Sequence, residues 1–367
     1  MPNRSFIKKV SRWKRIKGTA LLILFLSVIL GLIYPVFADG SRSIYPYANG
    51  LAIGILGGMS ISFIELFLYY PIKHEFRFTW LLITKVLLYA GVFIILLLGV
   101  VMISRAIEFD YGFDLYIMAT HEQFLHFVHE EDFPQLILYT VTFTFIIIFI
   151  KEIGRKLGPE ILANFITGKY HRPKKEERIF LFIDLDGSTT LAEKLNETAY
   201  HLFISKFFKD ITESIILTKG EIYQYVGDQV VVSWKKNTGL KKENCIYTYF
   251  YSLQALQSER NRYLTRFGIA PSFKAAMHCG EVIRGEVGDV KSEIVFHGDV
   301  VNTTSRIERL CSELNQPLLI SENLIKFLPK YVTSQFISKG TFSLKGKGKK
   351  LEVFGLQNKG LTFLDSR

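Results

Sequence analysis

The chain has 367 residues, of which 49% are hydrophobic, and a formal net charge of +11. This length exceeds that of one typical domain. Much of the excess basic charge lies at the N-terminus and after the last apolar run, which indicates a membrane surface and argues against a nucleic-acid partner. Cys245, Cys279 and Cys311 form no Cys-x-x-Cys pair. Disulfides and a thiolate zinc site are therefore not expected, and a reducing compartment fits.

Four apolar segments near the N-terminus are long enough to cross a bilayer, which requires about 20 residues each. The first segment resembles a signal peptide, but its apolar run is too long and no convincing cleavage site follows. We therefore expect a basic N-terminus at residues 1–18 and a four-helix transmembrane domain at residues 19–150, with the lipid bilayer as a partner. The predicted spans are Thr19–Phe37, Ala48–Tyr70, Thr79–Ile103 and Phe133–Ile150.

Basic residues gather on one side of these predicted spans. They precede the first span, occur at Lys73 and Arg77 between the second and third, and follow the fourth at Lys151. The long segment after the third span is acidic instead. Because cytoplasmic loops are enriched in Lys and Arg, we expect a multi-pass protein of the inner (cytoplasmic) membrane with both termini in the cytoplasm.

Two features of the membrane half each allow two interpretations. Glu65 and Lys85 lie within spans, where charged side chains either face a bundle interior with a functional role or reach toward the interface. His121, His126 and His129 in the outer loop suit a metal- or pH-sensing site, or the polar face of an interfacial helix. An unknown ligand of the membrane domain or of the outer loop therefore stays open as a partner.

Residues 151–177 are predicted to form a helical linker. Ile153, Leu157 and Ile161 recur at helical spacing, although Gly158-Pro159 interrupts the run. The linker either pairs with its copy in a dimer or lies on the membrane surface.

Residues 178–358 alternate between strand and helix patterns and are followed by a tail at residues 359–367. The order β-α-β-β-α-β, followed by further elements, predicts an α/β (α+β) ferredoxin-like palm with helices on one face. The expected elements are a strand at 178–185, a helix at 188–218, a hairpin at 220–234, a helix at 244–266, strands at 272–278 and within 281–296, a helix at 300–314 and a strand at 351–356.

Two aspartates occupy positions that suit metal binding. Asp184 follows an apolar strand, and Asp228 lies at the tip of the predicted hairpin. In a palm these strands are adjacent, so the carboxylates could share two Mg²⁺ or Mn²⁺ ions, one activating a hydroxyl and one holding a triphosphate. Taken singly, Asp184 suits a helix N-terminus and Asp228 an Asx-type turn. Their joint placement favours metal binding.

Two further segments are candidates for phosphate binding. The turn Gly187-Ser188-Thr189 opens a predicted helix, whose N–H groups and dipole could cradle phosphates. Lys345, in a Lys- and Gly-rich segment, either reaches the terminal phosphates or belongs to a solvated basic loop.

Asn302 and Arg306 are four residues apart, so they share one face of a helix. The guanidinium would offset negative charge on a reacting phosphorus, and the amide would orient a ribose. The simpler interpretation is a polar surface face on which Arg306 pairs with Glu308 or Glu313.

Five segments in order resemble the catalytic domain of class III nucleotidyl cyclases, over roughly residues 177–356. They are Phe182-Ile183-Asp184-Leu185-Asp186-Gly187-Ser188-Thr189, Val226-Gly227-Asp228, His278-Cys279-Gly280, Gly298-Asp299-Val300-Val301-Asn302-Thr303-Thr304-Ser305-Arg306 and Leu344-Lys345-Gly346.

The resemblance implies a homodimer with two sites at its interface and attack of a ribose 3′-hydroxyl on the α-phosphorus. Pyrophosphate and a cyclic nucleotide would be the products. The backbone carbonyl of Leu185 would also contact metal. One chain would supply Asp184 and Asp228 to each site, and the other Asn302, Arg306 and Lys345.

The positions that select the purine depart from the family pattern. Gln224 stands where adenylate cyclases usually have Lys and guanylate cyclases Glu, and Val295 stands where Asp or Thr is frequent. A glutamine amide both donates and accepts hydrogen bonds, so it could serve either purine. The resemblance favours ATP, with GTP as the alternative.

Two rival functions remain. A diguanylate cyclase also uses a palm, but the turn at Gly227-Asp228 lacks the Gly-Gly-Asp-Glu-Phe pattern, and Asn302 and Arg306 would have no role there. A receptor that binds nucleotide without turnover is the non-enzyme alternative.

Overall fold

The computed structural model describes residues 4–38, 45–65, 78–109, 114, 122–129, 132–157, 168–169, 171–290, 292–343 and 350–357. The chain divides into two compact units, one of which is Trp13–Ile166, while the other contains Thr167–Arg367. Lys73, Arg77, His121 and Lys345, which carry sequence predictions, lie outside the described residues.

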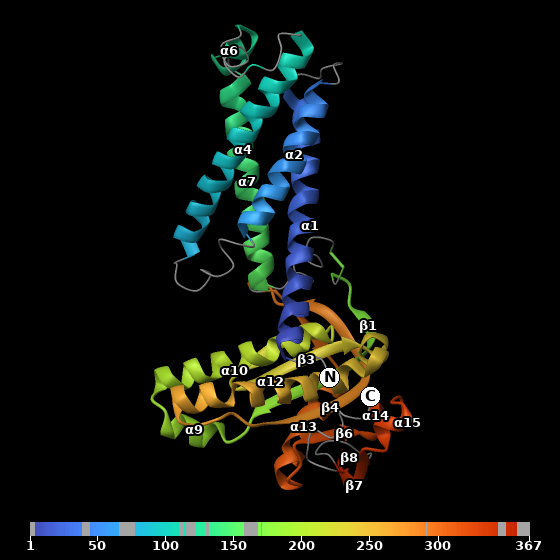
Figure 1. Cartoon of the computed structure of the whole chain (residues 1–367). Helices are drawn as coiled ribbons and strands as arrows, with labels where there is room; N and C mark the ends of the chain where they lie inside the picture. Colours follow the sequence, from blue (N-terminus) through green and yellow to red (C-terminus); the bar gives the residue numbers. More distant parts are fainter. Residues whose placement is uncertain are drawn as a thin grey trace. The chain divides into compact units, whose positions relative to one another are not determined.

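Four long helices among the described residues overlap the four predicted spans (Figure 1), and residues 66–70 of the second predicted span lie outside the described part of the chain. Three contain stretches long and apolar enough to cross a membrane, at Pro46–Ile64, Ile83–Glu108 and Gln135–Gly154, and the first has a shorter apolar stretch at Lys17–Ile33. The helices described before the second unit are α1 (Arg4–Ala38), α2 (Tyr45–Ile64), α4 (Phe78–Phe109), the short α6 (Glu122–His129) and α7 (Asp132–Leu157).

Helices α1 and α2 pack at close range along a row of glycines. Gly50, Gly54 and Gly58 recur every four residues on α2. A Cβ added at Gly54 would lie 2.7 Å from the carbonyl oxygen of Ser27 on α1, and one added at Gly58 would lie 3.0 Å from the Cα of Leu24. Small residues at this spacing let two helix backbones approach each other within a membrane bundle.

A buried ionic network joins Glu65, the residue directly after α2, to α4 and α7. The Nζ of Lys85 lies 2.9 Å from Oε1 of Glu65 and 3.0 Å from Oε1 of Glu152. Lys151 also pairs with Glu65, and the Tyr89 hydroxyl donates a hydrogen bond to it. Glu65 is 8% exposed and Lys85 2% exposed, so the structure favours the bundle-interior interpretation of these two charges over reach toward the interface.

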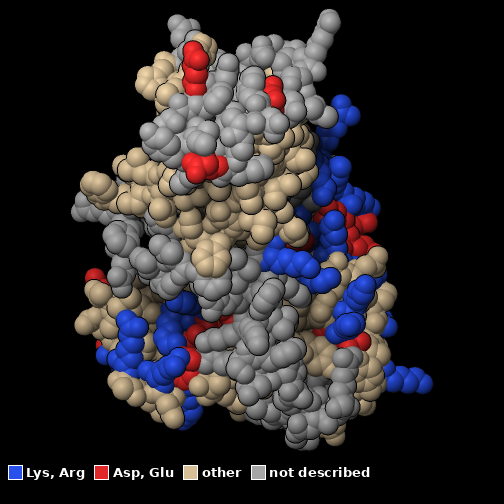
Figure 2. All heavy atoms as spheres, turned by 45° about the horizontal axis from the view of Figure 1, so that its top comes forward, with Lys and Arg blue, Asp and Glu red and all other residues tan. Residues whose placement is uncertain are grey.

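The end of the membrane unit that carries α6 is acidic. No Lys or Arg occurs between Arg105 and Lys151, and Figure 2 shows acidic side chains near α6. Within α6, Glu122, His126 and His129 are exposed. Among the described residues no group of three or more His, Cys, Asp or Glu side chains could hold a metal ion, so the sensor interpretation gains no support from them.

The second unit is built on a sheet in the order β2-β3-β1-β4-β6-β8-β7, with β5 paired to β4. Its first four strands have the order of a ferredoxin-like palm, which confirms the predicted fold. The strands are β1 (Lys174–Leu185), β2 (Glu221–Val226), β3 (Gln229–Lys235), β4 (Phe273–Val287), β5 (Glu293–His297), β6 (Leu318–Ser321), β7 (Phe336–Ser343) and β8 (Lys350–Leu356).

Helices cover both faces of this sheet. Ile179 and Ile183 of β1 belong to the core that includes residues of α10 and α12, whereas Phe180 and Phe182 of β1 pack with Val300 of α13. The prediction of helices on one face therefore holds for α10 and α12 (Figure 1) but not for α13. The physical reason is that β1 is apolar on both faces, and each face must be covered.

The helical elements of this unit are α9 (Ser188–Lys194), α10 (Glu197–Leu217), α11 (Lys236–Leu240), the 3₁₀ helix η2 (Lys241–Glu243), α12 (Asn244–Phe267), α13 (Asp299–Glu313), α14 (Glu322–Ile325) and α15 (Lys330–Thr333). The single helix predicted for residues 188–218 is divided in two. Asn196 causes the division, because its Oδ1 accepts a hydrogen bond from the backbone N–H of Ala199 at 2.8 Å and begins α10 as a cap.

The three cysteines are free and buried. Burial raises the pKa of the Cys245 and Cys311 thiols to about 12 and that of Cys279 to about 11. All three thiols are therefore protonated at neutral pH.

The ionic network yields a test. Lys85→Met should lower the free energy of unfolding of the full chain in detergent by about 3 kcal/mol or more, because Glu65 and Glu152 lose a buried cation that they share. Thermal unfolding measures the loss. Leu87→Met, at a position 68% exposed on the same helix, is the control and should leave stability unchanged. Equal stability of the two variants would show that the network does not hold the bundle together.

Candidate active site

Asp184 and Asp228 lie side by side where their strands end. The Cα of Asp184 on β1 pairs in register with that of Gln229 on β3, the residue that follows Asp228. Gly227, with a φ of 60°, makes the turn between β2 and β3 that carries Asp228. The strand order and the hairpin thus bring together two carboxylates that are 44 positions apart in the sequence.

Two further charged residues complete this cluster. Lys274 on β4 pairs in register with Asp184, and its Nζ lies 3.4 Å from Oδ2 of Asp184. The same Nζ lies 3.3 Å from Oε1 of Glu308 on α13 and donates a hydrogen bond of 2.9 Å to Oγ of Ser312. The acidic pair therefore has one cation and a third carboxylate as neighbours.

The cluster makes ionisation of Asp184 unfavourable. Burial, the nearby Glu308 and then Asp228 raise the pKa of Asp184 from 3.8 to about 6, against the opposing effect of Lys274. At neutral pH the three carboxylates and one ammonium leave two excess negative charges. A divalent cation at this position would offset that excess.

The donor set fits Mg²⁺ or Mn²⁺ bound jointly with a phosphate ligand. Mg²⁺ is usually held by one or two carboxylates together with substrate phosphates, and Asp184 and Asp228 supply the two carboxylates. Leu185, whose carbonyl is the third predicted ligand, is the last residue of β1. The described residues form no cluster of three or more side-chain ligands, and Mg²⁺ bound by two carboxylates usually completes its coordination with waters and substrate phosphates.

The predicted phosphate turn lies directly beside the aspartates. Gly187 adopts a left-handed conformation with a φ of 67°, and α9 begins at Ser188. Ser188 is half-buried and Thr189 exposed. The hydroxyl of Tyr200 on α10 is near this turn: burial, Asp228 and then Asp184 raise its pKa, and a hydrogen bond with Ser188 lowers it.

Asn302 and Arg306 lie on the same helix, α13, as Glu308, the residue that contacts Lys274 beside Asp184. On α13, Asn302 is exposed and Arg306 half-buried. Glu308 lies on the side of the same helix that packs against the sheet, where it contacts Lys274. The two predicted side chains therefore stand on a different face of α13 from the residue that approaches Asp184.

The strands that carry the two predicted purine positions, β2 and β5, are in contact through a pair of aromatic rings. Tyr223 precedes Gln224 on β2, Phe296 follows Val295 on β5, and the rings of Tyr223 and Phe296 lie 4.9 Å apart. Gln224 is exposed and Val295 half-buried. This places the two positions on neighbouring segments of one chain.

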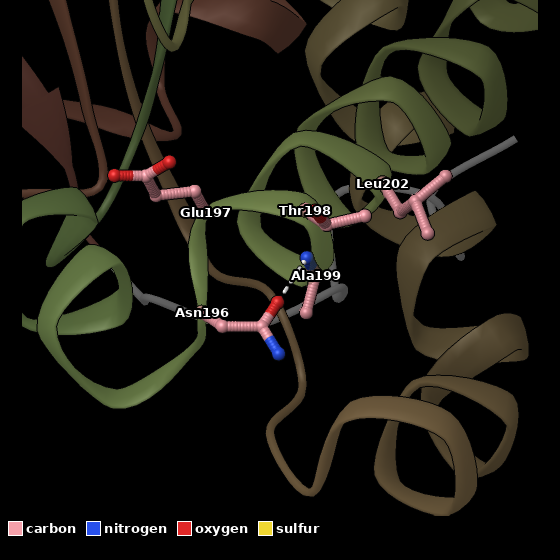
Figure 3. A pocket seen from close by; sticks show the side chains of 5 residues that line it. All are labelled: Asn196, Glu197, Thr198, Ala199 and Leu202. Atoms are coloured by element: carbon pink, nitrogen blue, oxygen red, sulfur yellow. Dashed lines mark hydrogen bonds between the residues drawn. The ribbon is translucent and has the colours of Figure 1, made fainter.

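Sequence reasoning missed Lys274, Glu308 and Tyr200 as members of the site. A signal existed for Lys274, because pairing the strands of a palm places it opposite Asp184. Glu308 and Tyr200 are recognised only from the packing of α13 and α10. A surface hollow at the start of α10 (Figure 3) contains none of the predicted site residues and is lined by Asn196, Glu197, Thr198, Ala199 and Leu202.

The charge crowding predicts a gain of stability from loss of one carboxylate. Asp184→Asn should raise the melting temperature of the full chain in EDTA near pH 7 by about 2 °C or more. The folded pKa of about 6 exceeds the ordinary 3.8. The stabilisation that protonated Asp184 gives the fold is therefore complete below pH 3.8. It is lost as the pH rises through about 6.

Thermal unfolding at about pH 5 and about pH 7 checks this sign, since the gain should be larger at the higher pH. The control is Asp186→Asn at an exposed neighbouring position, for which little change is expected. A variant Asp184→Asn that is less stable than the wild type near neutral pH would contradict the crowding.

Comparison with known proteins finds relatives that are named adenylate cyclases. Adenylate cyclase 2 of Rhizobium meliloti (strain 1021) is 34% identical over 223 residues, covering 60% of this chain and 61% of that protein. Adenylate cyclase of Anabaena cylindrica is 26% identical over 205 residues, covering 54% of this chain and 39% of that protein. The chain thus spans less than two thirds of either relative.

A solved structure of a bacterial light-regulated adenylyl cyclase has a TM-score of 0.52 and 20% sequence identity, covering 65% of this chain and 71% of that one. At this identity the likeness concerns the fold alone. A family model, described as the adenylate and guanylate cyclase catalytic domain, matches residues 171–358. Because this match covers more than half of the chain, the protein belongs to the adenylate and guanylate cyclase family.

Proposed function

We propose that this chain is a membrane-anchored adenylate cyclase that converts ATP to 3′,5′-cyclic AMP and pyrophosphate. The observation that carries the proposal is the convergence of Asp184 and Asp228, with two excess negative charges around them, inside the region that matches the cyclase catalytic domain. The choice of ATP is supported by the two relatives, both of which are named adenylate cyclases.

The side chains suit an in-line displacement at the α-phosphorus. Asp184, Asp228 and the carbonyl of Leu185 would hold Mg²⁺ or Mn²⁺, two ions per site. When bound, such ions lower the pKa of a coordinated hydroxyl and neutralise phosphate charge. The turn Gly187-Ser188-Thr189 would receive phosphate oxygens at its N–H groups.

The remaining groups would act on the ribose and on the reacting phosphorus. The amide of Asn302 would hydrogen-bond to the ribose and fix the direction of its 3′-hydroxyl. The guanidinium of Arg306 would stabilise charge that develops as the new P–O bond forms and pyrophosphate leaves. We assign Lys345 to the terminal phosphates.

A homodimer would complete each site. Within one chain, Asn302 and Arg306 lie on a different face of α13 from Glu308, the residue that approaches Asp184. This arrangement supports a site that takes its aspartates from one chain and these two residues from the partner. A closed two-fold dimer then contains two equivalent sites.

The N-terminal unit would anchor this enzyme in the inner (cytoplasmic) membrane. Three helices long and apolar enough to cross it, an acidic segment at one end and basic residues at the other support four spans with both termini in the cytoplasm. We further propose that the membrane unit regulates the activity.

The activity is tested with the purified full chain in lipid nanodiscs, supplied with ATP or GTP and Mn²⁺. We expect 3′,5′-cyclic AMP and pyrophosphate in equal amounts, measured by chromatography and mass spectrometry. If cyclic GMP is the only product, the substrate is GTP and not ATP. A cyclic dinucleotide would favour a diguanylate cyclase. Binding of nucleotide without any product would favour the receptor.

Sharing of sites is tested with two inactive variants. Asp184→Ala and Arg306→Ala should each lower kcat by about 100-fold or more, as removal of a charge-stabilising group does. A one-to-one mixture should recover about a quarter of wild-type activity, since half the dimers are mixed and each has one intact site. If tagged chains prove that mixed dimers form and the mixture stays inactive, each chain carries a complete site.

A further inference from the structure

We propose that Glu308 is a positioning residue that holds the ammonium of Lys274 between two carboxylates and so keeps Asp184 open to a metal ion. The inference rests on the proposed function, because it takes Asp184 as a metal ligand and the neighbouring space as the triphosphate site. It assigns a task to a buried carboxylate that the reaction itself does not use.

The contacts of Lys274 come mainly from one helix. Its Nζ lies 3.3 Å from Oε1 of Glu308 and 2.9 Å from Oγ of Ser312. Glu308 and Ser312 are one turn apart on α13, so they share a face. The third contact, to Oδ2 of Asp184, is the longest at 3.4 Å. The helix thus holds the ammonium beside Asp184, and the ammonium divides its contacts among Asp184, Glu308 and Ser312.

Glu308 itself is costly to bury. Only 6% of the residue is exposed, and its Oε1 makes no hydrogen bond within the described part of the chain. Its ion pair with Lys274 is what offsets this burial, since a charged group removed from water needs a counter-charge. The carboxylate also raises the pKa of Asp184 through direct repulsion. Glu308 therefore strengthens the attraction of the site for cations. It also restrains Lys274, the only lysine among the described residues that contacts Asp184.

Loss of Glu308 would change the partner of Lys274. The ammonium would then have Asp184 as its one carboxylate in contact, and it would form a closer pair with it. A metal ion would have to displace this ammonium from the oxygen that it needs as a ligand. Because the metal ion is expected to bind jointly with substrate phosphates, both metal and nucleotide binding should weaken.

Direct binding tests this proposal without turnover. The full chain in nanodiscs is titrated with Mn²⁺ alone, with free Mn²⁺ measured by electron paramagnetic resonance. It is then titrated with α,β-methylene-ATP, in which a methylene group replaces the oxygen between the α- and β-phosphorus atoms, so that pyrophosphate cannot leave. Glu308→Gln should raise the dissociation constant for each by about tenfold. Glu313→Gln, an exposed position on the same helix, is the matched control and should change neither.

The decisive comparison repeats Glu308→Gln in a Lys274→Met background. If Glu308 acts through Lys274, its effect on Mn²⁺ binding should largely disappear there, as a double-mutant cycle requires for coupled residues. An undiminished effect would show that Glu308 acts on the ion directly and would overturn the proposal. Unchanged binding by Glu308→Gln in the wild-type background would overturn it as well.

Two further measurements keep the outcome clear. Thermal unfolding shows whether Glu308→Gln is folded, and if it is not, Ser312→Ala replaces it. Ser312 is exposed, and its loss should weaken Mn²⁺ binding in the same direction by about threefold. No change in Ser312→Ala would then count against the proposal. A wild-type chain that binds Mn²⁺ and α,β-methylene-ATP but forms no cyclic nucleotide from ATP would refute the proposed function and leave the role of Glu308 standing.

Discussion

Mutual repulsion among three carboxylates is the constraint on which the site depends. Asp184, Asp228 and Glu308 are held close by a strand, a hairpin and a helix, none of which can withdraw without breaking the sheet or its packing. The fold therefore stores an electrostatic cost at the ends of β1 and of the β2–β3 hairpin, where burial, then Glu308 and then Asp228 raise the pKa of Asp184. Lys274 offsets part of it, and a divalent cation would offset the rest. The same three carboxylates thus lower the stability of the fold and attract a divalent cation.

The position of α13 has two consequences for this arrangement. One side of the helix packs on the sheet and contributes Glu308 and Ser312 to the surroundings of Lys274. Another side presents Asn302 and Arg306 away from that cluster. In the proposed homodimer a single rigid helix would thus serve two sites at once, one through the lysine that it holds and one through its polar face. Any displacement of α13 would alter both sites together.

Much of the fold follows from the order of apolar and polar patterns. The palm is specified by a strand that is apolar on both faces, a hairpin that turns at Gly227-Asp228 and two amphipathic helices, and the site aspartates follow because their strands are neighbours. The break at Asn196 was missed because a capping side chain competes with continued helical periodicity. Glu308 and Tyr200 were missed because their positions depend on tertiary packing, which spacing along a chain does not contain. The glycine row of α2 has a readable period, but only the packed helices show that it faces α1.

The burial of all three native thiols has a practical consequence for physical studies of this chain. Protonated, enclosed sulfur atoms react slowly with maleimides, so a cysteine introduced at an exposed position such as Arg309 on α13 would be labelled selectively without removal of the others. In the proposed homodimer, spin labels at that position would report the separation of the two copies of this helix. The natural sequence is already a suitable background for distance measurements across an assembled pair.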